Sequence, residues 1–370
     1  MGGFNATSLS ADLDSLEYNG VVQSGNIFDV LPTLEGSIYE KKIVIRNGKI
    51  DVTAFKGKEL LWAKEHLEDA ITEKLEDGQT IKKREDLGQG TNIVEEAIVN
   101  HIPYVPDDFN HIENTTIETG YVIVDKFGNE YVWVPVEDTR IFDGKINQKY
   151  DAYKDFVTDF NAMKNSIKIY GGFYIGRYEA SNVNGKVATV KNNFAWNNIK
   201  WGESLKNPGN NGAYGLAKNV ATTYNYSGFK STLVYNSMWD ATITFMNKSN
   251  DKNSLEYGNY NGSSFNVDNT DARGSKDDGK TFGYVANKSV NTRMLLTTGA
   301  VDRNCVKNIY DMAGNLSEWV IAPFNLNTNT VLVRGGEYSD LSNSVSIRYA
   351  VERNVSDSRV ATGFRVALYI

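Results

Sequence analysis

The segment DMAGNLSEW, residues 311–319, holds the side chains of this sequence best suited to bind a metal ion. Asn315 and Glu318 are three residues apart, so their oxygens can point at one spot. Such oxygens can hold backbone amides or a hard cation. Two side chains supply far fewer than the ~6 to 8 oxygens that calcium takes, so a metal-free, hydrogen-bonded corner is the alternative.

The same segment predicts a sharp, buried turn. Gly314 can adopt a positive φ angle, which lets the chain reverse between the apolar residues Met312 and Leu316. Trp319 follows at a distance that allows its ring to anchor the turn in a core. We therefore expect this turn to be part of the framework of the domain.

Catalytic groups are sparse in this sequence. Glu179, Asp240 and Glu318 could surround a metal in a cleft, but no pair of them has a spacing typical of catalysis. His66, His101 and His111 are scattered and form no metal-binding pair. Cys305 is the only cysteine, which excludes intramolecular disulfides, thiolate-rich zinc sites and paired-thiol chemistry, and it is expected to be a small buried hydrophobe.

The stretch GSKDDGKT, residues 274–281, matches a phosphate-loop pattern letter for letter. A phosphate loop needs a buried strand before it and a helix after it. NVDNTDAR precedes this stretch and FGYVANKS follows it, and neither has that character. We interpret it as a solvated loop.

Composition limits the classes of function. The chain has 370 residues, 41% hydrophobic and 23% charged, which suits a globular protein of two domains. Its net charge of −7 makes nucleic acid an improbable partner. No apolar run reaches the ~20 residues of a membrane span, and the N-terminus lacks the pattern of a secretion signal.

Residues 1–102 are predicted to form a small α/β domain. Asn47-Gly48 lies between two apolar-rich runs and predicts a hairpin. Residues 59–77 and 92–102 have apolar residues at helical spacing and predict two amphipathic helices. We expect this hairpin-plus-helices region to attach or oligomerise the protein, and the sequence leaves its oligomeric state open.

A second domain is expected over residues 103–370, where the composition becomes rich in Tyr, Asn and Gly. Residues 120–136 read as strand, turn and strand, 150–164 and 236–247 as helices, and 171–181 as a strand. Residues 182–289 are otherwise mostly loop.

Three blocks near the C-terminus, DMAGNLSEW, VLVRGGEY and TGFRVALYI, resemble in order and spacing the signature of the formylglycine-generating-enzyme, or sulfatase-modifying-factor, family. GNEYVWVPV and GGFYIGRYEAS are similar to its entry blocks, so the resemblance covers about residues 104–370. It implies an α+β, C-type-lectin-like fold with much irregular loop. It also implies that the DMAGNLSEW segment can contribute to a calcium site. Four arginines match those of the family and are expected to bridge loops through carboxylates and carbonyls: Arg334, Arg348, Arg353 and Arg365.

The catalytic chemistry of the family is not expected in this chain. Catalytic members bind copper through two cysteines, and Val345 and Ala350 align with those positions. An aliphatic side chain neither binds copper nor forms a thiolate. We therefore expect a protein that is not an enzyme and requires no cofactor, with calcium as an optional structural ion.

Between the RGG and GFR blocks the chain is rich in Ser, Asn, Asp and Tyr, which suits adaptable recognition. The resemblance extends to the variable proteins of bacterial and phage diversity-generating retroelements, which diversify this interval. It implies a protein or glycan ligand and favours an extracellular, cell-surface or virion location. The expected ligand-binding residues are Tyr338, Ser339, Asp340, Ser342, Asn343, Ser344, Ser356, Asp357 and Ser358.

Overall fold

The computed structural model describes residues 103–136, 138–143, 154–322, 329–341 and 346–370, together with six short strands within residues 1–102. The chain divides into two compact units. The first comprises Met1–Tyr104 and Lys168–Gly171, and the second comprises Val105–Ile167 and Gly172–Ile370.

Within the described residues of the first unit, the strands form three two-stranded pairs. Their strands are β1 (Leu16–Tyr18), β2 (Val21–Gln23), β3 (Val44–Arg46), β4 (Lys49–Asp51), β5 (Glu73–Lys74) and β6 (Thr80–Ile81). In the β3–β4 pair Arg46 lies opposite Lys49, so Asn47-Gly48 is the connection and the predicted hairpin is confirmed. Strand β5 falls where the end of the helix 59–77 was expected, because residues 73 and 74 pair with β6 instead. The rest of that expected helix, and the one over 92–102, lie outside the described residues.

A six-stranded antiparallel sheet organises the second unit, in the order β13-β25-β10-β9-β8-β7. Its strands are β7 (Phe109–His111), β8 (Val122–Asp125), β9 (Glu130–Pro135), β10 (Gly172–Gly176), β13 (Lys230–Leu233) and β25 (Val366–Tyr369). All residues of β10 and β25 are buried, as expected for central strands covered on both faces. The expected hairpin over 120–136 and the expected strand over 171–181 are confirmed as β8–β9 and β10.

A second sheet has four strands, in the order β23-β22-β21-β24. They are β21 (Ser317–Trp319), β22 (Thr330–Arg334), β23 (Ala350–Asn354) and β24 (Thr362–Phe364). The three C-terminal sequence blocks supply β21, β22 and β24, and β21 runs parallel to β24. This sheet therefore brings together the segments on which the family resemblance rests.

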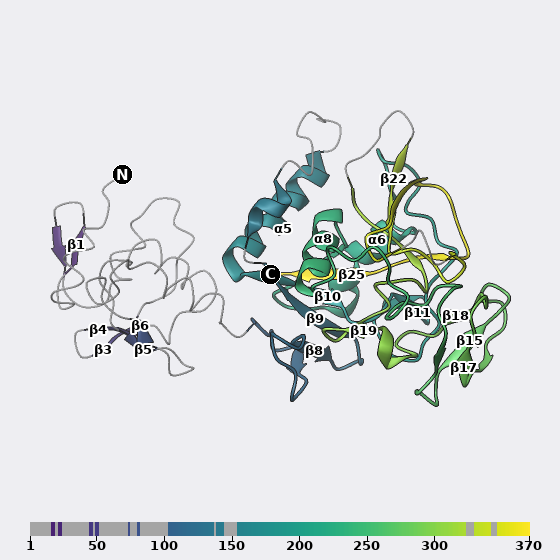
Figure 1. Ribbon diagram of the computed structural model, residues 1–370. Coiled ribbons are helices and arrows are strands. Elements are labelled where there is room, and N and C mark those ends of the chain that lie inside the picture. Colours follow the sequence, from purple (N-terminus) through teal and green to yellow (C-terminus); the bar gives the residue numbers. More distant parts are fainter. Residues whose placement is uncertain are drawn as a thin grey trace. The chain divides into compact units, whose positions relative to one another are not determined.

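The helices of the second unit are few. They are α5 (Lys154–Tyr170), α6 (Ala213–Lys218), α7 (Val220–Tyr224) and α8 (Asn236–Phe245), with two 3-10 turns, η4 (Thr139–Phe142) and η6 (Asp302–Asn304). Helix α5 buries Phe156, Phe160, Met163 and Ile167, which recur at helical spacing. The helices expected over 150–164 and 236–247 are thus confirmed. Figure 1 shows α8 and α6 close to β10 and β25, while β15 and β18 lie at the opposite end of this unit from α5.

Short strand pairs and loops make up the remainder of the second unit. The strands are β11 (Ser181–Val183), β12 (Lys186–Ala188), β14 (Phe265–Asn266), β15 (Arg273–Ser275), β16 (Gly283–Tyr284), β17 (Asn287–Lys288), β18 (Leu295–Leu296), β19 (Cys305–Val306) and β20 (Ile309–Tyr310). The unit is α+β, with mostly strands and loops and few helices, in agreement with the fold class expected from the sequence. None of the helices that the structure describes has the length and apolarity of a membrane span.

Candidate ligand-binding surface

The turn in DMAGNLSEW is built as its sequence predicts. Gly314 has a φ of 74° and Asn315 one of 55°. A Cβ atom on Gly314 would lie 2.3 Å from the carbonyl oxygen of Asn259, so only glycine fits against that strand-like segment. Trp319 is fully buried and donates its indole N–H to the Ile199 carbonyl at 2.8 Å. The turn is therefore a fixed part of the core.

Asn315 uses its amide group to join three segments. Its Oδ1 accepts from the Leu296 backbone N–H at 2.9 Å and from Asn259 Nδ2 at 3.0 Å. Its Nδ2 donates to Glu179 Oε2 at 2.5 Å. The oxygen that would bind calcium thus already accepts two hydrogen bonds.

Glu318 faces a different partner. Its carboxylate accepts from Arg365 Nη2 at 2.7 Å and from Arg365 Nε at 3.1 Å, and both side chains are buried. Asn315 and Glu318 therefore turn their oxygens to separate protein donors. These contacts favour the metal-free corner over a calcium site, and calcium remains a prediction.

Arg365 confirms the bridging role expected for the family arginines. Besides Glu318, it donates to the carbonyls of Gly176 and Tyr310, each at 2.9 Å. Arg334 acts similarly, because it bonds Asp240 Oδ1 at 3.0 Å and the Tyr349 carbonyl at 3.2 Å. Among the described residues, Arg353 donates only to the neighbouring Glu352 carbonyl, at 3.3 Å, and no bridging bond of Arg348 is found.

Three carboxylates surround Arg365 and influence one another. Burial raises the pKa of Glu179 well above its ordinary value, with further increases from the charges of Asp311 and Glu318. Burial likewise raises the pKa of Glu318, against the opposing effect of Arg365, and raises that of Asp311 to about 6. One arginine cannot neutralise three carboxylates, so this buried cluster favours protonation of a carboxyl group.

Glu179, Asp240 and Glu318 do not surround a common cleft. Glu179 accepts from Asn315 and from the Leu316 backbone, whereas Asp240 pairs with Arg334. Within the described residues, no group of three or more His, Cys, Asp or Glu side chains could hold a metal ion. The arrangement assigns these carboxylates to the framework.

The positions that align with the copper-binding cysteines can be located only in part. Ala350 is an exposed residue at the start of β23, and Val345 lies outside the described residues. Cys305 is half-buried in β19, less buried than expected, and burial raises the pKa of its thiol to about 11. A thiol with that pKa is protonated at neutral pH and is a poor nucleophile.

The phosphate-loop-like stretch has the wrong surroundings for a nucleotide. Its first residues belong to β15, and a turn leads to β16 rather than to a helix. Asp277 closes this turn by accepting from Ser275 Oγ and Thr281 Oγ1, both at 2.6 Å. The structure thus confirms the interpretation as a loop.

Among the expected ligand-binding residues, Tyr338 requires a correction. It is 1% exposed and packs with Ala195, Leu295, Leu316 and Ala361, because its ring completes a small hydrophobic cluster. Its hydroxyl donates to Asp278 Oδ1 at 2.6 Å. Tyr338 therefore supports the surface from below and does not supply contact area.

Ser339 and Asp340 are half-buried beside Glu337. Ser339 Oγ donates to Glu337 Oε1 at 2.7 Å, and Asp340 Oδ2 accepts from the Glu337 backbone at 2.8 Å. Burial raises the pKa of both carboxyl groups, and the positive charges of Arg353 and Arg359 lower them. Ser342, Asn343 and Ser344 lie outside the described residues.

Ser356, Asp357 and Ser358 are exposed, as expected. Ser356 Oγ donates to Asn354 Oδ1 at 2.8 Å. Ser358 Oγ donates to the Asn198 carbonyl at 2.6 Å, which attaches this segment to a loop 160 residues earlier. The segment is thus held in place while its polar groups face solvent.

Exposed apolar side chains lie next to this segment, and the sequence analysis did not identify them. Phe194 is 53% exposed, and its ring centroid lies 4.4 Å from that of Phe282. Val360 is 40% exposed and Leu341 69%. We call residues 194–198, 278–282, 339–341 and 356–360 the loop surface. No sequence signal identified Phe194, because only the fold bonds residues 197 and 198 to residues 360 and 359.

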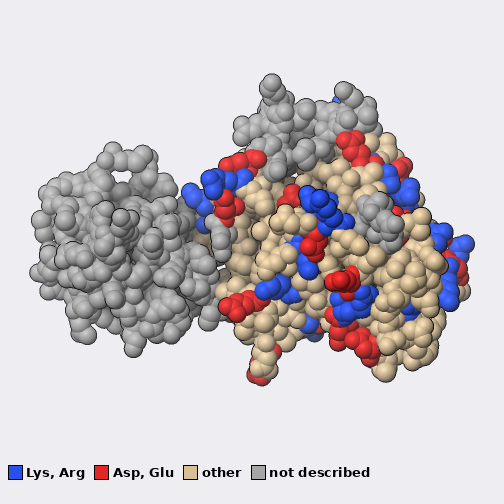
Figure 2. All heavy atoms as spheres, viewed as in Figure 1, with Lys and Arg blue, Asp and Glu red and all other residues tan. Residues whose placement is uncertain are grey.

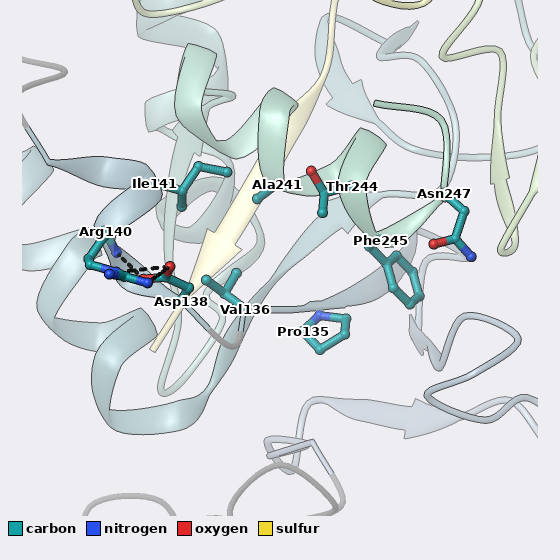
Figure 3. Close-up of a pocket in the computed structure, with 9 residues that line it drawn as sticks. All are labelled: Pro135, Val136, Asp138, Arg140, Ile141, Ala241, Thr244, Phe245 and Asn247. Carbon is teal, nitrogen blue, oxygen red and sulfur yellow. Dashed lines mark hydrogen bonds and ion pairs between the residues drawn. The ribbon is translucent and has the colours of Figure 1, made fainter. Parts of the chain in front are cut away.

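A separate pocket of about 830 Å³ lies between η4, the end of β9 and α8. Figure 3 shows Asp138 and Arg140 paired on one side and Phe245 and Asn247 on the other, with Pro135 and Val136 between. Arg140 is already matched by the Asp138 carboxylate at 2.8 Å. The pocket contains none of the expected ligand-binding residues.

Comparison with family models identifies the C-terminal part of the chain. Residues 249–370 match the sulfatase-modifying factor enzyme 1-like domain. This segment of the chain is similar to that family's domain. The β21, β22 and β24 strands of the matched segment hold the three blocks that the sequence analysis singled out, so the resemblance is confirmed.

Comparison with solved structures gives distant similarities. The crystal structure of CarF shares 13% identity over 54% of this chain and 87% of its own, with a TM-score of 0.35. PvdO from Pseudomonas aeruginosa shares 12% identity over 67% of this chain and 98% of its own, with a TM-score of 0.36. Variable protein 1 of Treponema denticola shares 15% identity over 73% of this chain and 94% of its own, with a TM-score of 0.26. No curated protein matches the chain.

Proposed function

We propose that this protein is a non-catalytic ligand-binding protein of a bacterial or phage surface, and that it recognises a protein or glycan through the loop surface. The observation that carries the proposal is the set of bonds that joins loops distant in sequence. Asn197 Nδ2 donates to the Val360 carbonyl at 2.6 Å, and the Asn198 backbone donates to the Arg359 carbonyl at 3.0 Å. Tyr338 adds the bond to Asp278 described above.

These bonds favour recognition because they hold exposed groups in a fixed arrangement. Loops on a rigid scaffold lose little conformational entropy on binding, which improves affinity. Phe194, Phe282 and Val360 offer apolar contact area, and Ser356, Asp357 and Ser358 offer adaptable hydrogen bonds. Apolar anchors beside polar groups are the usual anatomy of an interface.

The alternative is a metal-dependent enzyme of the same superfamily with an unrecognised active site. Two observations weigh against it: aliphatic residues stand where the copper-binding cysteines are aligned, and the buried carboxylates are engaged by Arg365 and Asn315. Metal analysis of the purified protein separates these functions. Stoichiometric copper or iron would support the enzyme and contradict the proposal.

The charge distribution argues against nucleic acid as the ligand. On the face shown in Figure 2, Lys and Arg side chains alternate with Asp and Glu over the described residues and form no continuous basic field. A phosphate backbone needs such a field.

We extend the proposal to diversification by a retroelement, which predicts a nearby near-copy of the coding segment for residues 334–365 that differs mainly at adenines.

Binding to a glycan array and to a displayed library of cell-surface proteins tests the proposal. Phe194→Ser together with Val360→Ser should weaken binding of any selected ligand at least about tenfold, because both are exposed apolar side chains of the loop surface. Phe127→Ser is the matched control, since Phe127 is 55% exposed but lies at the β8–β9 turn. Equal binding by all three proteins would contradict the proposal.

A further inference from the structure

Strand β23 forms one edge of the four-stranded sheet, and no other strand in the described part of the chain pairs with its outer side. Ala350 and Glu352 are exposed, and Val351 and Arg353 are half-buried. The strand leads through Val355 into residues 356–360 of the loop surface. An unprotected edge strand is a ready site for pairing with another chain.

The hydrogen-bond pattern shows which peptide groups of β23 face outward. Gly335 N donates to the Tyr349 carbonyl at 3.2 Å, and Val355 N donates to the Asn329 carbonyl at 3.1 Å, so these pairs are bonded across the two strands. Antiparallel pairs alternate between bonded and non-bonded, so Val351 and Arg353 also bond across to β22. The peptide groups of Ala350 and Glu352 therefore point away from the sheet.

The neighbouring strand confirms this alternation. Val320 N donates to the Leu332 carbonyl at 3.1 Å, so Leu332 directs its peptide group to β21 and not to β23. Leu332 lies opposite Glu352 in the register. The N–H groups of Ala350 and Glu352 and the carbonyl of Ala350 are thus directed outward, and the Glu352 carbonyl has only the 3.3 Å contact from Arg353 Nη1.

We propose that the outer edge of β23 binds an extended segment of a protein partner, which adds to the sheet as a further strand. The inference rests on the proposed function, since it specifies the kind of ligand. Main-chain bonds to Ala350 and Glu352 supply affinity in this mode, and side chains opposite the edge supply specificity. A glycan has no regular series of donors and acceptors at strand spacing, so this edge specifies a protein.

Charge defines the chemistry of the partner strand. Glu352 is exposed on the edge, and its carboxylate accepts only the Thr330 hydroxyl at 2.9 Å among the described residues. Successive side chains of a strand point to opposite faces, so Arg353 lies on the other face, where its charge and that of Arg359 offset Glu337 and Asp340. Opposite charges stabilise directly opposed positions of a sheet, so the partner carries Lys or Arg opposite Glu352.

A second copy of this chain is the less suitable occupant. The antiparallel register with the longest overlap would place Glu352 directly opposite Glu352 of the second copy. Like charges at directly opposed positions destabilise strand pairing. Sedimentation of the full chain decides this point: self-association that Glu352→Pro abolishes would assign the edge to a second copy and overturn the proposal.

The probe is a library of random twelve-residue peptides displayed on phage and selected against the full chain. We expect enrichment of peptides with a Lys or Arg flanked by β-branched residues. Glu352→Pro should weaken an enriched peptide at least tenfold, because proline removes the outward N–H and an edge strand tolerates it there. Glu352→Ala keeps the N–H and should lose less than fivefold. Equal affinity for wild type and Glu352→Pro would overturn the proposal.

Peptide N-methylation tests the same inference without changing the protein. Two versions of the enriched peptide are compared, one N-methylated at its odd-numbered residues and one at its even-numbered residues. One version should lose binding and the other should bind within twofold of the unmodified peptide, because only alternate N–H groups of an added strand face β23. Losses without alternation would overturn strand addition. If no peptide enriches but the loop surface still binds a glycan or a folded protein in the Phe194→Ser experiment, this inference fails while the proposed function stands.

Discussion

At the scale of the residue, Arg365 connects three segments of the second unit that are far apart in the sequence. It joins the end of β10, the Tyr310 carbonyl before the DMAGNLSEW turn and Glu318 on β21. A fully buried guanidinium is stable only when its donors are all satisfied by nearby oxygens. This explains why an arginine stands in the GFR block, where neighbouring Phe364 and Val366 are fully buried apolar residues.

Replacing Arg365 with Met should lower the free energy of unfolding by about 3 to 5 kcal/mol, because Glu318 would remain as an unpaired buried carboxylate. Urea unfolding followed by tryptophan fluorescence measures this change. Arg353→Met is the control and should change stability by less than about 1 kcal/mol, since Arg353 is half-buried and among the described residues donates only to the neighbouring Glu352 carbonyl. Similar losses in both variants would contradict the role given to Arg365.

Asp311→Asn tests the buried carboxylates through pH. The pKa of Asp311 is raised from 3.8 to about 6, so the folded state binds more protons than the unfolded state between these values. Its contribution to stability is present below pH 3.8 and is lost as the pH rises through about 6. The free energy of unfolding of the wild type should therefore fall relative to that of Asp311→Asn over this range. Asn suits the position, where φ is 56°. A constant difference between the two proteins would refute the assignment.

At the scale of the element, the loops of the second unit depend on left-handed backbone at asparagine. Asn adopts positive φ more readily than other residues with a side chain, because its short amide bonds locally. The described residues contain such asparagines in loops, in short hairpin turns and at the C-terminal end of α7: Asn114, Asn184, Asn192, Asn198, Asn225, Asn247, Asn291, Asn308, Asn315 and Asn329. The abundance of Asn in this sequence thus has a backbone cause as well as a role at the surface.

The turn at Gly314 gives the prediction for this scale. Gly314→Ala should lower the free energy of unfolding by about 3 kcal/mol, because alanine adds backbone strain and brings Cβ against the Asn259 carbonyl. Gly185→Ala is the matched control. Its φ of 80° imposes similar strain, but nothing lies within 4 Å of the added atom, so we expect about 1 kcal/mol. Thermal unfolding that ranks the two variants equally would show that the close approach to Asn259 is unimportant.

At the scale of the whole molecule, the chain divides near residue 104, and the second unit has its own core. A chain that begins at Val105 should therefore unfold in one cooperative transition at a midpoint within a few degrees of the full protein. Calorimetry of both forms measures this. A broad transition with no heat-absorption peak would show that residues 1–104 are needed to fold the rest.

The local elements of the domain could be predicted from the sequence because their causes are local. Asn47-Gly48 specifies a two-residue hairpin, Gly314 allows the left-handed turn, and the spacing of Phe156, Phe160, Met163 and Ile167 gives α5 a buried face. The helix predicted over residues 59–77 is wrong at residues 73 and 74. These residues pair with β6, although the apolar spacing around them fits a helix.

Only the tertiary structure decided which side chains meet. Tyr338 is polar and was expected at the surface, yet Leu295, Leu316 and Ala361 bury it. Phe194 and Val360 carry no mark in the sequence, but the bonds of residues 197 and 198 to residues 359 and 360 place them together. The exposure of β23 depends on strand order in the same way. Residue type and spacing determine turns and helix faces because those contacts span a few residues. Which side chains are buried, and which lie side by side, depends on contacts between residues more than a hundred positions apart, and only the folded chain establishes these.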